Sequence, residues 1–167
     1  MVNETPAGIA GMRKTRISVT ALALSFMAAT ACFAANAQLG TWKLNEAKSK
    51  IAPGMGKNTT VTYSEQKGDK IKIVVDGVDK DGKARHTVWV GKFDGKAYPM
   101  KRSMQADSIA YKMVNERTNE ITAMKDGKTV WSGTITVATD GKSRTVDTHG
   151  TDEKGKKFTS KAVYDKQ

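Results

Sequence analysis

The feature that most constrains the fold is an Asp-Gly pair that recurs between short segments of alternating polarity. Four such pairs are followed by lysine, at Asp81-Gly82, Asp94-Gly95, Asp126-Gly127 and Asp140-Gly141. Asp and Gly accept the positive φ that tight hairpin turns demand, so such a pair between alternating segments predicts a hairpin. Further reversals are predicted at 68–69, 116–119 and 154–156. The chain from residue 66 onward is therefore predicted to be a series of antiparallel hairpins.

The segments between these turns carry apolar side chains at every second position. In one of them Ile71, Ile73 and Val75 share a face, while lysines occupy the other face. Period-two alternation places such side chains on one side of a sheet, and that side must be covered. We predict nine strands, at 40–45, 59–66, 70–78, 84–93, 107–115, 118–125, 129–138, 143–150 and 157–165.

Short one-sided strands joined by tight turns form an up-and-down meander, which covers its shared face by closing into a barrel. Two longer gaps interrupt the pattern, at 46–58 and 96–106. The first contains Pro53-Gly54 and is predicted to be a flexible flap rather than a pair of helices. The predicted fold class is all-β, an antiparallel up-and-down meander closing into a small barrel of about nine strands.

The first 37 residues have the pattern of a secretory signal peptide. A basic region at 13–16 precedes the apolar run 17–31, and small residues lead to the A-x-A motif at 35–37. The apolar run of 15 residues is short for a membrane span. We predict cleavage after Ala37, a barrel domain over 38–167, and a periplasmic or secreted location. An uncleaved membrane anchor is the alternative.

Cys32, the single cysteine, offers a second alternative. A cysteine at the end of an apolar export run can be the acylated residue of a bacterial lipoprotein. The preceding residues 29–31 lack the leucine usual three positions upstream, and the motif at 35–37 is the better cleavage site. Lipoprotein anchoring at Cys32 is therefore the less favoured reading. A chain cut after Ala37 has no cysteine, which excludes disulfides and thiol catalysis.

The mature chain of 130 residues has the length of one domain and a net charge of +9, from 25 Lys and Arg against 16 Asp and Glu. A basic surface of this kind attracts lipid headgroups, anionic polymers or nucleic acid. The lysines are scattered through turns rather than gathered into a stripe, so a role in solubility is favoured and no specific nucleic-acid contact is predicted. Weak contact with an anionic surface is the alternative.

The titratable side chains form no recognisable catalytic or metal site. His86 and His149 lie on different predicted strands, and neither has the spacing of a Ser/His/Asp triad or of a metal-ligand set. We therefore predict no catalytic residue, no metal ligand and no cofactor.

Several short stretches resemble known protein families. The opening Gly40-Thr41-Trp42 is similar to the first strand of the calycins, the lipocalins and fatty-acid-binding proteins, and 163–166 resembles the last strand of the latter. The stretches 75–78, 92–99 and 150–152 resemble small exported bacterial proteins described as lipocalin-like. The resemblance implies a barrel with Trp42 closing one end and an internal site for an apolar ligand. The resemblance to fatty-acid-binding proteins would imply an Arg-x-Tyr triplet on the last strand, which holds the ligand carboxylate. The matching triplet here begins with Ala162, so the arginine is missing.

A set of aromatic side chains is predicted to line the cavity of such a barrel. They are Tyr63, Trp89, Tyr111, Trp131 and Tyr164. The alternative is that they fill the interior completely, because small barrels can be packed solid. Arg144 could hold an anionic headgroup, but it follows the turn at 141–143, so we expect it at the rim, in reach of water.

These observations favour a monomeric, exported, non-catalytic protein that binds a small apolar or amphipathic ligand inside its barrel. The second hypothesis is a basic surface module for anionic polymers or membrane surfaces, with a solid interior.

Overall fold

The computed structural model describes Met1 and residues 36–101, 105–152 and 154–167. The predicted apolar export run and Cys32 lie outside the described residues. The described part contains a single turn of 3-10 helix, η1 (Glu46–Lys48), and ten strands: β1 (Gly40–Leu44), β2 (Lys57–Gln66), β3 (Lys70–Val78), β4 (Ala84–Gly91), β5 (Asp94–Lys101), β6 (Ser108–Asn115), β7 (Thr118–Lys125), β8 (Lys128–Val137), β9 (Ser143–Thr151) and β10 (Lys157–Lys166). No helix among these residues is long and apolar enough to cross a membrane.

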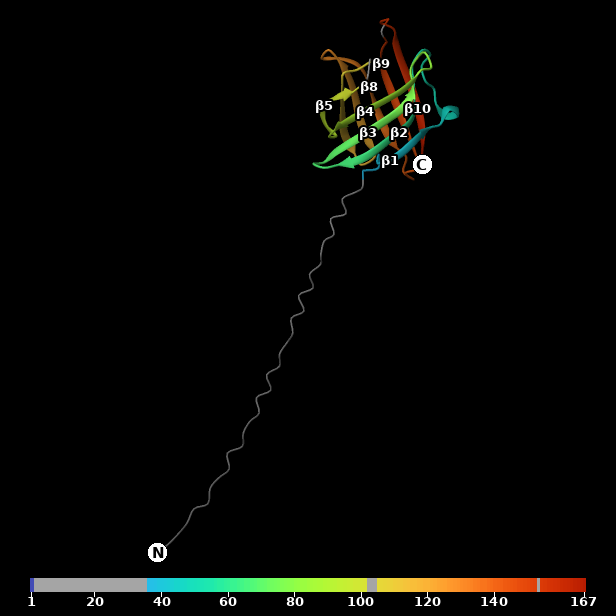
Figure 1. The fold of residues 1–167 in the computed structure, drawn as a ribbon. Coiled ribbons are helices and arrows are strands. Elements are labelled where there is room, and N and C mark those ends of the chain that lie inside the picture. Colours follow the sequence, from blue (N-terminus) through green and yellow to red (C-terminus); the bar gives the residue numbers. More distant parts are fainter. Residues whose placement is uncertain (2–35, 102–104, 153) are drawn as a thin grey trace. The chain divides into compact units, whose positions relative to one another are not determined.

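The strands form one closed barrel in which each strand pairs with its neighbours in the sequence (Figure 1). All pairings are antiparallel, and the tight turns between the strands produce this up-and-down order. The barrel closes where the first strand meets the last, with Trp42 opposite Lys166 and Leu44 opposite Tyr164. The predicted all-β meander closing into a lipocalin-like barrel is confirmed.

The predicted number of strands is wrong by one, because β5 occupies most of the gap expected at 96–106. Its side chains are mostly exposed and it contains Pro99, so it shows no apolar alternation. Its pairing with β4 is short and joins Val88 to Lys101 and Trp89 to Met100. Pairing with β6 holds the strand for more of its length, with a register shift between Asp94 and Ala97. Backbone pairing therefore defines β5, in which only Tyr98 and Met100 are half-buried and pack against the core.

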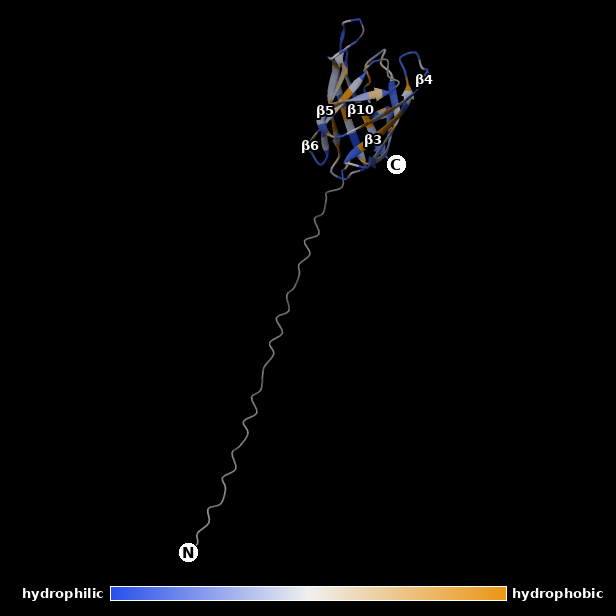
Figure 2. Ribbon diagram, turned by 60° about the vertical axis from the view of Figure 1, so that its left-hand side comes forward, coloured by the Kyte–Doolittle hydropathy of each residue, from blue (hydrophilic) through white to orange (hydrophobic). Residues whose placement is uncertain are grey.

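The core lies inside the barrel, where alternate side chains of neighbouring strands meet. Val61 and Tyr63 on β2 and Ile71 and Ile73 on β3 are buried, whereas most of the residues between them are more exposed. Figure 2 shows the resulting pattern, with apolar segments along the strands and hydrophilic turns at their ends. The gap 46–58, predicted to be a flap, contains the single turn η1 and the first residues of β2 rather than a helix pair, and it contributes Ile51 to the lining of the interior.

One glycine permits the close approach of two central strands. Gly133 on β8 faces Thr148 on β9, and a Cβ atom built on Gly133 would collide with the carbonyl oxygen of Asp147. Because this carbonyl belongs to the backbone, the collision could be relieved only by moving a strand of the barrel.

We predict that Gly133→Ala destabilises the barrel, because the added methyl group forces β8 and β9 apart. The expected loss in the free energy of unfolding is about 1–3 kcal/mol. Urea unfolding followed by tryptophan fluorescence would measure it. Ser132→Ala is the matched control on the same strand, where only the contact of Ser132 Oγ with His149 Nε2 is lost. Equal stability of the two variants would contradict this account of Gly133.

Candidate functional site

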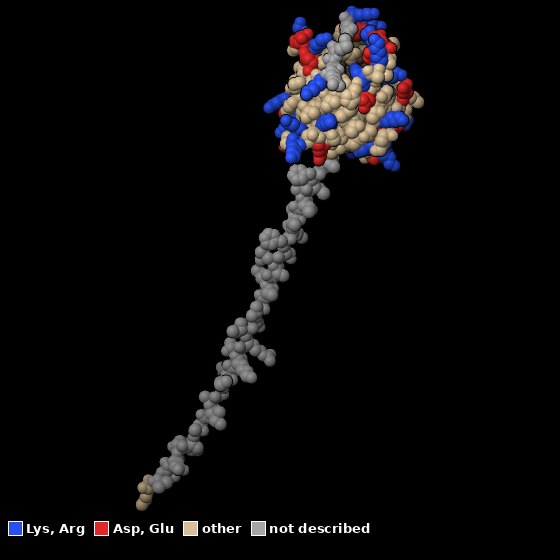
Figure 3. All heavy atoms as spheres, in the orientation of Figure 1, with Lys and Arg blue, Asp and Glu red and all other residues tan. Residues whose placement is uncertain are grey.

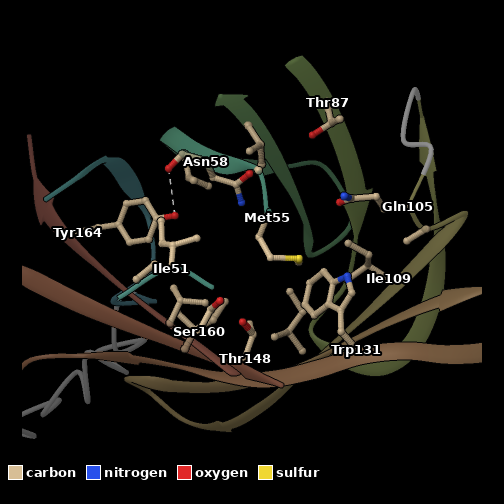
Figure 4. Close-up of a pocket in the computed structure, with 18 of the residues that line it drawn as sticks. Ile51, Met55, Asn58, Thr87, Gln105, Ile109, Trp131, Thr148, Ser160 and Tyr164 are labelled. Atoms are coloured by element: carbon tan, nitrogen blue, oxygen red, sulfur yellow. Dashed lines mark hydrogen bonds between the residues drawn. The ribbon is translucent and has the colours of Figure 1, made fainter. Parts of the chain in front are cut away.

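The barrel interior is hollow. A partly open cavity of about 170 Å³ lies between opposite walls of the sheet (Figure 4). Aliphatic side chains from five strands supply much of its surface, namely Val61, Ile109, Ile121, Ile135 and Val146. Met55 from the segment before β2 reaches into the same space. The alternative of an interior packed solid is therefore wrong.

Four of the five aromatic residues singled out in the sequence line this cavity. They are Tyr63, Tyr111, Trp131 and Tyr164. They come from β2, β6, β8 and β10, so the closure of the barrel brings together residues from distant parts of the chain. Their role in ligand binding stays a prediction.

The expectation that Trp89 lines the cavity is wrong. Its ring is buried among Phe93, Tyr98 and Tyr111, with centroid separations of 6.2, 5.8 and 4.7 Å. Its indole Nε1 donates a hydrogen bond to the carbonyl oxygen of Ile109 at 3.1 Å. Trp89 is therefore a packing residue in the barrel wall, and neighbouring rings fill the space that a ligand would need.

Trp42 lies at the closed end of the barrel and is fully buried. Its indole Nε1 donates a hydrogen bond to the carbonyl oxygen of Gln38 at 2.7 Å. A turn places Gln38 there, since the backbone amide of Leu39 donates to the carbonyl oxygen of Asn36 at 3.0 Å. The Gln38 side chain then donates to the carbonyl oxygen of Arg117 at 3.3 Å, which ties the turn to the loop between β6 and β7. Residues 36–39 thus cover this end of the barrel.

The expectation that Arg144 lies at the rim is wrong, because the segment 36–39 covers the barrel end at which it stands. Arg144 is only 2% exposed. Its guanidinium carbon lies over the rings of Trp42, Tyr63 and Tyr164, at 4.9, 4.7 and 4.9 Å from their centroids. It also donates a hydrogen bond to Gln38 Oε1 at 3.3 Å. The negative faces of the three rings stabilise the buried charge.

A second arginine, Arg85 on β4, also lines the cavity, and the sequence did not lead us to predict it there. Its guanidinium donates to Asn58 Oδ1 and, at 3.4 Å, to Gln105 Oε1. Burial lowers the pKa of Arg85, and attraction to Asp79 opposes that effect. Alternation could have revealed it, because Arg85 shares a strand face with Thr87 and the buried Trp89.

The described residues that line the cavity include two arginines and no aspartate or glutamate. Tyr164 connects the two arginines: its ring lies under Arg144, and its hydroxyl donates to the carbonyl oxygen of Asn58 at 3.1 Å. The interior therefore combines an aliphatic surface with an excess of positive charge.

A second, open hollow of about 990 Å³ adjoins the cavity at the mouth of the barrel. Met55, Gln105, Trp131 and Phe158 line both spaces. The turns around the mouth supply its charged residues, which are Lys80, Lys125, Lys154, Lys156, Lys157, Asp81 and Asp152. The mouth, like the interior, therefore has more cationic than anionic side chains.

The two histidines lie outside the cavity lining. His86 Nδ1 is 2.6 Å from Asp76 Oδ1 on the outer face, and His149 contacts Ser132. Within the described ranges, no group of three His, Cys, Asp or Glu side chains is placed to hold a metal ion.

Comparison with known proteins supports the fold alone. No family model and no curated protein matches the sequence. Among solved structures, the wild-type fluorescent protein UnaG is similar, with a TM-score of 0.54 and 15% identity over 77% of this chain and 96% of that protein. A point mutant of UnaG gives a TM-score of 0.56 at 15% identity, over 78% and 96% of the two chains. This chain therefore has a calycin-like barrel.

Two of the tyrosines that line the cavity, Tyr111 and Tyr164, have raised pKa values. Burial raises the pKa of Tyr164 to about 12, although the positive charge of Arg144 acts in the opposite direction. Burial also raises the pKa of Tyr111 well above its usual range. Both hydroxyls therefore stay protonated in the folded protein at pH values where an unfolded chain ionises its tyrosines.

We predict that the protein loses stability between about pH 10 and pH 12, because the unfolded chain releases the tyrosine protons first. Tyr164 contributes a slope of up to about 1.4 kcal/mol for each pH unit in this window. Urea unfolding at several pH values would measure the slope. Since lysines titrate in the same range, the informative comparison is with Tyr164→Phe, which should reduce it. Identical slopes for the two proteins would contradict the prediction.

Proposed function

We propose that this chain is an exported, monomeric, non-catalytic binding protein that holds a small apolar or amphipathic molecule inside its barrel. The observation that carries the proposal is the cavity of about 170 Å³ with its aliphatic, aromatic and polar lining. Ligand sites commonly combine a largely apolar wall with a few placed polar groups. An apolar cavity of about 150 Å³ in another protein accepts benzene, so the enclosed part of the ligand is a compact group of this order.

The proposed export rests on the signal-like segment that precedes the barrel. Cleavage after Ala37 would cut within the turn 36–39, next to Gln38, which is 1% exposed. Cleavage there would remove Asn36, whose carbonyl oxygen accepts from the amide of Leu39. Gln38 would still be held at the barrel end by its contacts with Trp42, Arg117 and Arg144.

We expect the protein to carry a bound molecule when the full chain is expressed in an exporting host and purified without denaturation. Native mass spectrometry should show the mass of one processed chain plus a small ligand, and denaturation should release the ligand. The mass of the denatured chain also locates the cleavage site. A ligand-free mass, together with no uptake from an offered extract of apolar metabolites, would contradict an internal binding site.

The lysines around the mouth support a second candidate function, contact with an anionic surface. Lys154, Lys156 and Lys157 follow one another in and beside a single turn at the mouth. Figure 3 shows Lys and Arg spread over the visible face of the barrel with Asp and Glu between them. The charge is therefore not gathered into one broad patch on that face, and the mouth is the region to test.

If this second function holds, the protein should bind phosphatidylglycerol vesicles and not phosphatidylcholine vesicles. Co-sedimentation should fall steeply as salt rises, because exposed charges are screened over about 10 Å at 0.1 M salt. Replacing Lys154, Lys156 and Lys157 by glutamine should abolish binding. The control replaces three exposed lysines outside the mouth, Lys43, Lys67 and Lys70. Equal losses in the two triple variants would indicate attraction by net charge rather than docking through the mouth.

A further inference from the structure

Arg85 is half-buried in the cavity wall, and the described residues that line the cavity include no aspartate or glutamate to balance its charge. Buried cations in proteins are normally paired with acids, because removing an unpaired charge from water is costly. Here neutral side-chain oxygens of Asn58 and Gln105 accept from the guanidinium. The acid that acts on Arg85 electrostatically, Asp79, uses Oδ1 to accept from the backbone amides of Asp81 and Lys83 in its own turn. The guanidinium is thus held in position while its charge is left uncompensated within the lining.

Two hydrogen-bonding atoms beside this charge are buried and have no hydrogen-bond partner among the described residues. They are Arg85 Nε and Thr87 Oγ1. Thr87 is 1% exposed, and its hydroxyl is directed into the pocket in Figure 4. A buried polar atom left without a partner costs free energy, so such atoms call for an explanation in a folded protein.

The two atoms lie on one face of one strand. Arg85 and Thr87 are two residues apart on β4, and their Cα atoms are therefore separated by about 6.6 Å along the strand. Because both groups belong to the same face of the strand, the two oxygens of one oxyanion could accept from Arg85 Nε–H and from the Thr87 hydroxyl together. Charge-assisted hydrogen bonds of this kind are the strong ones, and the guanidinium edge suits carboxylates.

We propose that Arg85 and Thr87 form an anion subsite in the cavity wall, which binds the carboxylate of a compact amphiphile whose apolar part occupies the aliphatic interior. This inference rests on the proposed function and specifies the class of ligand. Arg144 is not the anchor in this scheme, because three aromatic rings and Gln38 already surround its guanidinium. The aliphatic walls at Ile109, Ile121 and Ile135 take the apolar part of the ligand.

The test compares two probes of the same shape and different charge, 3-phenylpropanoate and its neutral amide 3-phenylpropanamide. Both are titrated by isothermal calorimetry into protein purified after expression of the full chain. The variants are Arg85→Gln, which removes the charge, and Thr87→Val, which removes the hydroxyl at nearly constant shape. Arg117→Gln is the matched control, because it removes the same charge from an exposed turn. Circular dichroism establishes that each variant is folded.

The wild-type protein should bind the acid roughly 10- to 100-fold more tightly than the amide, the range expected for a charge-assisted hydrogen bond. Arg85→Gln should bring the two affinities together and leave amide binding nearly unchanged. Thr87→Val should reduce the preference by a smaller factor, and it carries the test if Arg85→Gln does not fold. Arg117→Gln should retain the full preference.

Two negative results have different meanings. If both probes bind equally to the wild-type protein, or if Arg85→Gln keeps the preference for the acid, the anion subsite is refuted and the binding cavity stands. If neither probe binds, and native mass spectrometry shows no bound molecule and no uptake, both the subsite and the proposed function are refuted.

Discussion

The hollow interior depends on the pairing of the first strand with the last. β1 has only five residues, yet it lies between β2 and β10 and removes the two exposed edges that an open sheet would have. Lys166 on the adjacent strand β10 covers Trp42, and its Nζ lies 5.1 Å from the centroid of the tryptophan ring. The last residue adds to the closure, because the backbone amide of Gln167 donates to the carbonyl oxygen of Thr41 at 2.9 Å. A sheet without this pairing could not enclose the cavity.

Closure also fixes the electrostatic character of the interior. Arg144 is almost fully buried and Arg85 is half-buried, and the barrel compensates the two charges in different ways. Three aromatic rings and an amide oxygen surround Arg144, so its charge is balanced by groups that also close the barrel. Arg85 contacts two amide oxygens, and its buried Nε, like that of Arg144, has no hydrogen-bond partner among the described residues. Arg144 therefore helps to close the barrel, whereas Arg85 lies in the cavity wall beside the unpartnered hydroxyl of Thr87.

The sequence predicted the fold well, because Asp-Gly turns and period-two alternation are local signals. β5 was missed because its exposed side chains carry no alternation and only pairing with β4 and β6 defines it. Arg144 was misplaced because a turn at its side suggests a rim, whereas the segment 36–39 covers that end from far away in the chain. Arg85 was overlooked for a related reason: an arginine near the end of a strand is usually solvated, and local sequence cannot show which loops enclose it.

The positive charges at the mouth are exposed to solvent, whereas that of Arg85 lies in the cavity wall. This difference in environment distinguishes the two candidate functions. The lysines at the mouth are in contact with solvent, so their attraction for an anion is screened within about 8 Å at physiological salt. Arg85 is half-buried in the cavity wall, where the same charge acts more strongly than on the surface and in a fixed geometry. Exposed lysines can raise the rate at which an anionic amphiphile reaches the mouth, but they cannot distinguish one anion from another. Selectivity therefore has to arise inside the barrel, from groups whose positions the surrounding strands determine.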